Sequence, residues 1–186
     1  MLDHRRILRQ LTGHRVRAHA LTHAHPDHYG SSHAVCDALD IPLWCGERDA
    51  HVAQGASPAP GRGRGAALLA KLPLPDPHAV ERRLREDDEV AGFRVLDTPG
   101  HSPGHVSYWR ESDRTLVCGD VFFNLNPLTL KRGLREPPRL LTHDPALNRE
   151  SARRLGRLRP ALVLVGHGPP HRDTASFTRF AESLPR

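Results

Sequence analysis

The chain has 186 residues, of which 38% are hydrophobic and 26% are charged, and its formal net charge is +6. This composition excludes a disordered or fibrous protein, and the length suits one domain, which we expect to span residues 1–186. No apolar run approaches the roughly 18 residues of a bilayer-spanning helix, and no signal-peptide core follows Met1, so we expect a cytoplasmic protein without a membrane partner.

The first part of the chain predicts alternating helices and strands. Apolar residues recur at helical spacing in residues 3–11, and residues 15–21 alternate as in a strand. Helices over residues 31–39 and 49–54 flank a short strand over 41–45. Residues 55–65 are rich in Gly, Pro and Ala and predict a flexible loop, whose Arg62 and Arg64 would lie near an anionic substrate if the loop forms a rim.

The second part predicts more strands and two longer helices. Strands are expected over residues 90–97, 105–109 and 115–118, with a hairpin turn over 111–114. Residues 124–142 contain many Asn and Pro residues and are expected to be irregular. Asp144 and Pro145 form a strong helix start, and that helix runs toward Leu158. The apolar run 161–165 predicts a buried strand, and residues 173–184 predict a final amphipathic helix.

The basic residues are mostly arginines, scattered along the chain rather than collected in a block. Few tyrosines and tryptophans are available to stack on bases. We therefore interpret the charge as a solvated surface and expect a small-molecule substrate rather than a nucleic acid partner.

The three cysteines, Cys36, Cys45 and Cys118, cannot all pair and lack the spacing of a zinc finger. We expect reduced thiols, as in a reducing compartment. Cys118 lies in an apolar segment, where it would pack as a small buried residue.

Seven potential metal ligands recur along the chain: His23, His25, Asp27, His28, His101, Asp120 and His167. The first four lie in one run at the end of a predicted strand. In an extended segment His23 and His25 point the same way, so both rings can meet one metal. Asp27 and His28 follow where the chain turns into a helix, so their side chains can face a second position. Such a cluster has no packing rationale and predicts two divalent metals side by side.

The other three candidate ligands each follow a predicted strand. His101 lies in the rigid turn Thr-Pro-Gly-His-Ser-Pro-Gly-His, and Asp120 follows Gly119. His167 lies between two glycines, which let the backbone approach a site closely. We expect these three residues to converge on the histidine-rich run.

Three further residues are weaker candidates. His105 would orient a ligand by a hydrogen bond. Asp97 would accept a hydrogen bond from a ligating histidine, and His171 would lie at the rim of the site.

The histidine-rich run resembles the His-x-His-x-Asp-His signature of the metallo-β-lactamase superfamily. The Thr-Pro-Gly-His run, the Gly-Asp pair and the Gly-His-Gly turn resemble later motifs of that family, in the same order. The resemblance implies an α/β fold, an αββα sandwich with the metals at one edge between two sheets. It also implies a ligand set: His23, His25 and His101 on one metal, Asp27, His28 and His167 on the second, and Asp120 bridging both.

Family members usually carry several strands before the first motif, whereas this chain reaches His23 almost at once. We therefore expect the first sheet to lack N-terminal strands and to present an open edge. Pairing in a homodimer would cover that edge.

A metal-bound water has its pKa lowered toward about 7, which supplies hydroxide at neutral pH. The motifs resemble the glyoxalase II branch most, which implies a dinuclear zinc hydrolase acting on a small thioester or ester-like substrate. Iron or manganese could replace zinc. By the same resemblance, Asp27 would also orient the nucleophile or move its proton.

A lactonase-like hydrolase stays open beside the thioesterase, and three further alternatives do as well. Related members are persulfide dioxygenases with one iron held by two histidines and an aspartate, so metal content and oxygen uptake would distinguish them. A non-catalytic metal-binding module would hold metal without turnover on any substrate panel. A nuclease would bind RNA or DNA in a salt-sensitive way.

Overall fold

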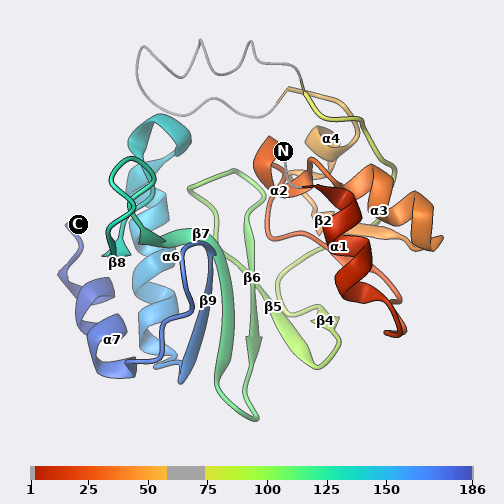
Figure 1. The fold of residues 1–186 in the computed structure, drawn as a ribbon. Coiled ribbons are helices and arrows are strands. Elements are labelled where there is room, and N and C mark those ends of the chain that lie inside the picture. Colours follow the sequence, from red (N-terminus) through yellow and green to blue (C-terminus); the bar gives the residue numbers. More distant parts are fainter. Residues whose placement is uncertain (1–2, 58–73, 186) are drawn as a thin grey trace.

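The computed structural model describes residues 3–57 and 74–185 of the chain. These residues form helix, sheet, sheet and helix layers, as the αββα prediction requires (Figure 1). None of the described helices is both long and apolar enough to cross a bilayer.

The first half of the molecule is built on a small parallel sheet with the strand order β1-β2-β3. Its elements are α1 (His4–Leu11), β1 (His19–Ala20), α2 (Pro26–Tyr29), α3 (Ser32–Leu39), β2 (Leu43–Gly46), α4 (Ala50–Ala53) and β3 (Val80–Leu84). β1 is shorter than the predicted strand over 15–21, because its partner β2 begins only at Leu43, opposite His19. β3 was not predicted, since Glu81, Arg82 and Arg83 hide its strand pattern.

The second half is built on a six-stranded sheet with the order β4-β5-β6-β7-β8, in which β9 also pairs with β7. Its elements are β4 (Glu89–Val90), β5 (Phe93–Asp97), β6 (Val106–Arg110), β7 (Thr115–Leu125), β8 (Arg132–Arg135), the 3-10 turn η1 (Arg139–Leu141), α6 (Pro145–Arg157), β9 (Leu162–His167) and α7 (Thr174–Ser183). The turn predicted over 111–114 joins β6 and β7 as expected.

Two predictions in this half are corrected. The segment 90–97 is a hairpin, because Ala91 and Gly92 both have positive φ and reverse the chain between β4 and β5. Residues 124–142 are not uniformly irregular. β7 runs on to Leu125 because β9 pairs along it as far as Phe123 and β8 pairs with its end, and β8 itself lies within the segment.

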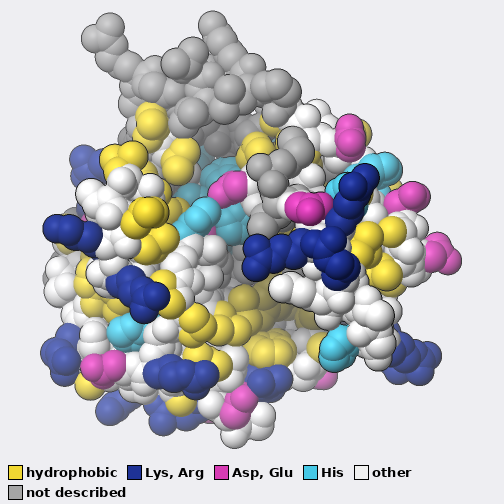
Figure 2. All heavy atoms as spheres, viewed as in Figure 1, with side chains coloured by type: hydrophobic (Ala, Val, Ile, Leu, Met, Phe, Trp, Pro, Cys, Tyr) yellow, Lys and Arg dark blue, Asp and Glu magenta, His cyan; other side chains and the backbone are white. Residues whose placement is uncertain are grey.

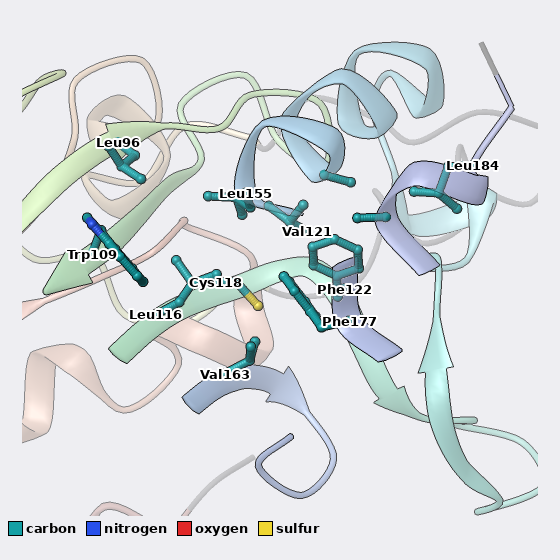
Figure 3. Packing of buried hydrophobic residues seen from close by; sticks show 12 residues of the cluster. Leu96, Trp109, Leu116, Cys118, Val121, Phe122, Leu155, Val163, Phe177 and Leu184 are labelled. Atoms are coloured by element: carbon teal, nitrogen blue, oxygen red, sulfur yellow. The ribbon is translucent and has the colours of Figure 1, made fainter. Parts of the chain in front are cut away.

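Three buried clusters separate the layers. One lies between the six-stranded sheet and the helices α6 and α7, and includes Phe122, Leu155 and Phe177 (Figure 3). A second lies between the sheets, around Leu84 and Val95. The third packs the first sheet against its helices. The three cysteines are buried and unpaired within these clusters, as predicted.

The helix predicted after Asp144 forms, with that side chain accepting hydrogen bonds from the backbone N–H groups of Ala146 and Leu147 at 3.0 and 3.2 Å. The apolar run 161–165 also forms a strand, β9, but most of it is only partly buried. Val163 is the fully buried residue of that strand, because β9 lies at the edge of the described sheet beside β7.

Candidate metal centre

The seven candidate ligands come from four segments of the chain that meet at one edge of the two sheets. His23 and His25 lie between β1 and α2, and Asp27 and His28 lie within α2. The remaining three come from the second half. His101 lies in the loop between β5 and β6, Asp120 in the middle of β7, and His167 at the end of β9. Figure 2 shows histidine side chains gathered in the middle of one face, where the two halves meet.

Asp120 does not follow a strand, as the sequence suggested, but lies inside one. Gly119 has φ of 51°, and the pairing of β7 with β9 shifts register at this residue. Such an irregularity redirects a side chain within a strand. The carboxylate oxygen Oδ2 of Asp120 lies 3.4 Å from His101 Nε2, 3.3 Å from His28 Nε2 and 3.2 Å from His167 Nε2. One carboxylate therefore faces both predicted metal positions.

The other side chains form two close groups. His25 Nδ1 and His101 Nε2 lie 2.9 Å apart, and His28 Nε2 and His167 Nε2 lie 3.4 Å apart. Asp27 Oδ2 lies 3.1 Å from His167 Nε2. The groups His23, His25 and His101, and Asp27, His28 and His167, each have one ligand atom per residue within 4.8 Å of one another. These two groups have the members that the family resemblance implied, and a third group, His23, His28 and Asp120, meets the same limit and connects them. The assignment of residues to each metal stays a prediction.

Two atoms at the centre lack hydrogen-bond partners within the described part of the chain. They are His23 Nε2 and Asp120 Oδ1, and both are buried. A buried polar atom without a partner is costly, unless a ligand satisfies it. Gly166 leaves space for this arrangement, since a Cβ at that position would lie 1.9 Å from Asp120 Oδ1. Imidazole nitrogens and carboxylate oxygens suit zinc, iron and manganese, so the residues present fit two divalent cations.

The electrostatics favour the ligating forms of most of these groups. Burial lowers the pKa of His23 and of His101, which keeps both imidazoles neutral. Burial opposes ionisation of Asp120, but hydrogen bonds from His167 and His28 outweigh it and hold the pKa of that carboxyl well below its usual range. Hydrogen bonds to Asp120 and Asp27 raise the pKa of His167 to about 10. A bound cation would replace the His167 proton between those carboxylates.

His105 supports the centre from behind, as expected for an orienting residue. Its Nε2 accepts a hydrogen bond from the backbone N–H of Asp120 at 3.1 Å. Nε2 must therefore be the unprotonated nitrogen, and Nδ1 donates to Thr98 Oγ1 at 2.9 Å. Burial lowers the pKa of His105 to about 3, so the ring stays neutral and keeps this tautomer.

Asp49 is a supporting residue that the sequence analysis missed. Its buried carboxylate accepts hydrogen bonds from Ala24 N at 3.2 Å, Ser102 Oγ at 2.5 Å and Gly104 N at 2.6 Å. It thus joins the loop of His23 and His25 to the loop of His101. A Cβ on Gly104 would lie 2.2 Å from Asp49 N, so this close approach requires glycine. In the sequence, Asp49 looked only like the first residue of a short helix.

Two of the weaker predictions are wrong. The Asp97 side chain pairs with Arg48 rather than with a ligand histidine, with Oδ2 and Nη2 3.3 Å apart. His171 lies beside α7, where its backbone pairs with Val163 and its ring lies next to Phe177. Most of the loop predicted over 55–65, with Arg62 and Arg64, lies outside the described residues.

Known proteins resemble this chain in sequence. The family model of the metallo-beta-lactamase superfamily matches residues 3–167. The probable metallo-hydrolase YflN of Bacillus subtilis (strain 168) is 32% identical over 175 residues, which cover 85% of this chain and 66% of that protein. YybB of the same strain, also a probable metallo-hydrolase, is 30% identical over 82% of this chain and 64% of its own length. The chain thus spans about two thirds of the length of these relatives.

A hydroxyacylglutathione hydrolase of Bdellovibrio bacteriovorus is 28% identical over 56% of this chain and 34% of its own length. Solved structures are similar over more of the chain. TTHA1623 in a di-iron-bound form has a TM-score of 0.71 and 34% identity, covering 91% of this chain and 80% of its own. The B3 metallo-beta-lactamase BLEG-1 has a TM-score of 0.68 and 30% identity, covering 91% and 78%. The chain described here belongs to the metallo-β-lactamase superfamily and has its fold.

Proposed function

We propose that this protein is a dinuclear metallo-hydrolase that cleaves a small thioester or ester-like substrate. The observation that carries the proposal is the convergence of seven ligand side chains into two groups that share Asp120. Family membership and the metallo-hydrolase relatives support hydrolysis as the reaction class.

A pair of divalent cations held by these residues would supply a water activated at neutral pH and a Lewis acid for the substrate oxygen. We propose zinc as the resident metal, with iron or manganese as substitutes. The donor set of five imidazoles and two carboxylates suits all three, and the similar structure TTHA1623 is described in a di-iron-bound form.

The residues of the chain divide the remaining work. Asp120 and His23 are buried and fix the inner side of the centre, whereas the Asp27 side chain is 57% exposed and faces the approach of substrate. In thioester hydrolysis, water adds to the carbonyl carbon, the carbon–sulfur bond breaks, and the leaving thiolate takes up a proton. Asp27 is positioned to accept the proton of the attacking water and to pass it on.

The test is metal content and turnover measured on the same samples. Zinc-, iron- and manganese-loaded protein is assayed on thioesters, lactones and phosphodiesters. We expect two metals per chain and thioester or lactone hydrolysis. Asp120→Asn should lower metal content and reduce turnover roughly thousandfold, whereas Asp27→Ala should lose turnover while the metal of the other group remains. Asp37→Asn, on the exposed side of α3, is the matched control.

Other results would overturn the proposal. One iron per chain with oxygen uptake on a persulfide would identify a dioxygenase. Two metals per chain without turnover on the whole panel would identify a non-catalytic metal-binding module.

A further inference from the structure

A buried hydroxyl lies beside the candidate ligand His101. It belongs to Thr142, which is 1% exposed and ends the 3-10 turn η1. Thr142 Oγ1 lies 3.4 Å from His101 Nδ1. The other ring nitrogen of His101, Nε2, lies 2.9 Å from His25 Nδ1 and 3.4 Å from Asp120 Oδ2. One nitrogen of this ring therefore faces the hydroxyl, and the other faces the candidate metal centre.

The hydrogen bonds of Thr142 fix the direction of its contact with His101. A hydroxyl has one hydrogen to donate, and Thr142 Oγ1 donates it to the carbonyl oxygen of Pro138 at 2.9 Å. Since that hydrogen is already used, Oγ1 can only accept a hydrogen bond from the ring. In the neutral imidazole, His101 Nδ1 must then carry the proton, and Nε2 keeps its lone pair. A histidine binds a metal through such an unprotonated nitrogen.

The backbone around Thr142 holds the hydroxyl in this position. The N–H of His143 donates to the carbonyl oxygen of His101 at 3.1 Å, and the N–H of Asp144 donates to that of Gly100 at 2.7 Å. The segment that follows η1 is thus bonded to the loop of His101 at the residues next to Thr142. Its hydroxyl meets the ring in a fixed geometry, as a group that orients a metal ligand requires.

His23, in the same predicted ligand group, has the same arrangement. Thr22 Oγ1 lies 3.2 Å from His23 Nδ1. His23 Nε2 is buried and has no hydrogen-bond partner within the described part of the chain. Both buried histidines of this group therefore have a hydroxyl at Nδ1 and present Nε2 to the centre. Thr22 is the neighbour of His23 in the sequence, whereas Thr142 reaches His101 from 41 residues away and does so only in the folded chain.

We propose that Thr142 is a positioning residue of the metal centre, whose hydroxyl selects the His101 tautomer that leaves Nε2 free for a cation. The inference rests on the proposed dinuclear centre, but not on its reaction or its substrate. Thr142 acts only through the ring of His101. Its removal should therefore change how tightly metal binds rather than which substrate is cleaved.

The first test determines the tautomer in the metal-free protein. Nitrogen-15 NMR of histidine-labelled protein distinguishes protonated from unprotonated ring nitrogens, and the His101 signals are assigned by their loss in His101→Gln. We expect a protonated Nδ1 and an unprotonated Nε2. Thr142→Val keeps the shape of the side chain but not the hydroxyl, so the form protonated at Nε2 should appear. Thr142→Ser keeps the hydroxyl and should have the tautomer of the unchanged protein.

The second test measures zinc binding by competition with a chelator of known affinity. Thr142→Val should weaken the tightest zinc site about 10- to 100-fold, and Thr142→Ser should recover most of the loss. Thr174→Val is the matched control. Thr174 Oγ1 also donates to a proline carbonyl oxygen, that of Pro160 at 2.7 Å, but it does so near the start of β9, at the end opposite to His167. This control should leave the His101 tautomer and the zinc affinity unchanged.

The possible results separate this proposal from the proposed function. A His101 ring protonated at Nε2 in the unchanged protein would overturn the role of Thr142, and this measurement needs no variant to fold. Equal zinc affinity of Thr142→Val and the unchanged protein would overturn it as well. If Thr142→Ser loses as much affinity as Thr142→Val, the side chain acts by packing and the proposal is wrong. The expected tautomer and zinc binding, without turnover on the whole substrate panel, would overturn the hydrolase and leave Thr142 as a positioning residue.

Discussion

The two halves of this molecule contribute almost equally to the candidate metal centre but differ greatly in how they are built. The first half has a sheet of three strands, with a β1 of two residues and an α1 without a buried residue. The second half has an 11-residue β7, buried along nearly its whole length and covered by α6 and α7. Four candidate ligands nevertheless come from the first half. The less tightly packed first half must therefore be held in position by the second.

Three contacts between the halves provide that support. Asp49 binds the loop between β5 and β6, as described above. The hydroxyl of Tyr108 donates a hydrogen bond to the carbonyl oxygen of Leu21 at 2.5 Å. The backbone N–H of Val106 donates to the carbonyl oxygen of Thr22 at 2.8 Å. All three act within a few residues of His23, so the second half fixes the start of the histidine-rich run.

The largest expected effect tests the contrast in packing directly. Phe177→Ala on α7 removes a ring with 0% exposure and should lower the free energy of unfolding by about 3–5 kcal/mol. Leu11→Ala on α1 removes a partly buried side chain outside the three buried clusters, and should cost less, about 1–2 kcal/mol. Urea unfolding of the metal-free protein measures both. Equal losses would show that the first half is packed as tightly as the second.

The same contrast separates what the sequence could predict from what it could not. Local signals worked well in both halves: the Asp144–Pro145 helix start, the turn over 111–114 and the histidine-rich run depend on neighbouring residues. β3 and β8 escaped notice because charged residues dominate both. Each is a strand because a partner lies beside it: β3 pairs with β2, which is distant in sequence, and β8 pairs with the end of β7 at an irregular register.

The candidate site shows the same limit. All seven candidate ligands were identified from the sequence, because histidines and carboxylates at strand ends are unusual and follow a family pattern. As ligands they stay a prediction until metal is measured. Asp49 was missed because its three donors come from residues 24, 102 and 104, so its importance arises only on folding. The position of Asp120 inside β7 depends on the irregularity at Gly119, which single-sequence patterns do not reveal.

A smaller effect, but one focused on the site, is expected for Asp49→Ala. The substitution leaves the backbone N–H groups of Ala24 and Gly104 and the hydroxyl of Ser102 without their acceptor. Because this carboxylate orients two ligand loops, metal affinity should fall about 10- to 100-fold, the range typical of residues that orient metal ligands. Competition with a chelator of known affinity measures the change, at a temperature where the variant is folded by circular dichroism.

Asp37→Ala on the exposed side of α3 controls for loss of a carboxylate in the same half. Asp49→Asn, which keeps one side-chain oxygen, should recover part of the affinity. If Asp49→Ala binds metal as tightly as the unchanged protein, the second half holds the histidine-rich run by the other two contacts alone.

The smallest expected effect concerns an ion pair between α6 and the connection that leads from β3 to β4. Arg154 of α6 donates hydrogen bonds to both carboxylate oxygens of Glu86 and to the carbonyl oxygen of Asp97, and Asp97 N donates to Glu86. Burial opposes ionisation of Glu86, but the hydrogen bonds from Arg154 and Asp97 outweigh it and lower its pKa. Stability from this carboxylate is therefore present above its unfolded pKa of about 4.3 and is lost as pH falls through the lower folded pKa.

For this partly exposed pair we expect roughly 0.5–1 kcal/mol of unfolding free energy to disappear between about pH 5 and pH 3. Urea unfolding of Glu86→Gln across that range should show a correspondingly shallower loss, with unchanged metal affinity at pH 7. If the two proteins lose stability in parallel, Glu86 is not the titrating group. If Glu86→Gln also weakens metal binding, the second half does not act as an independent support, because a change outside the three cross-links would then reach the histidine-rich run.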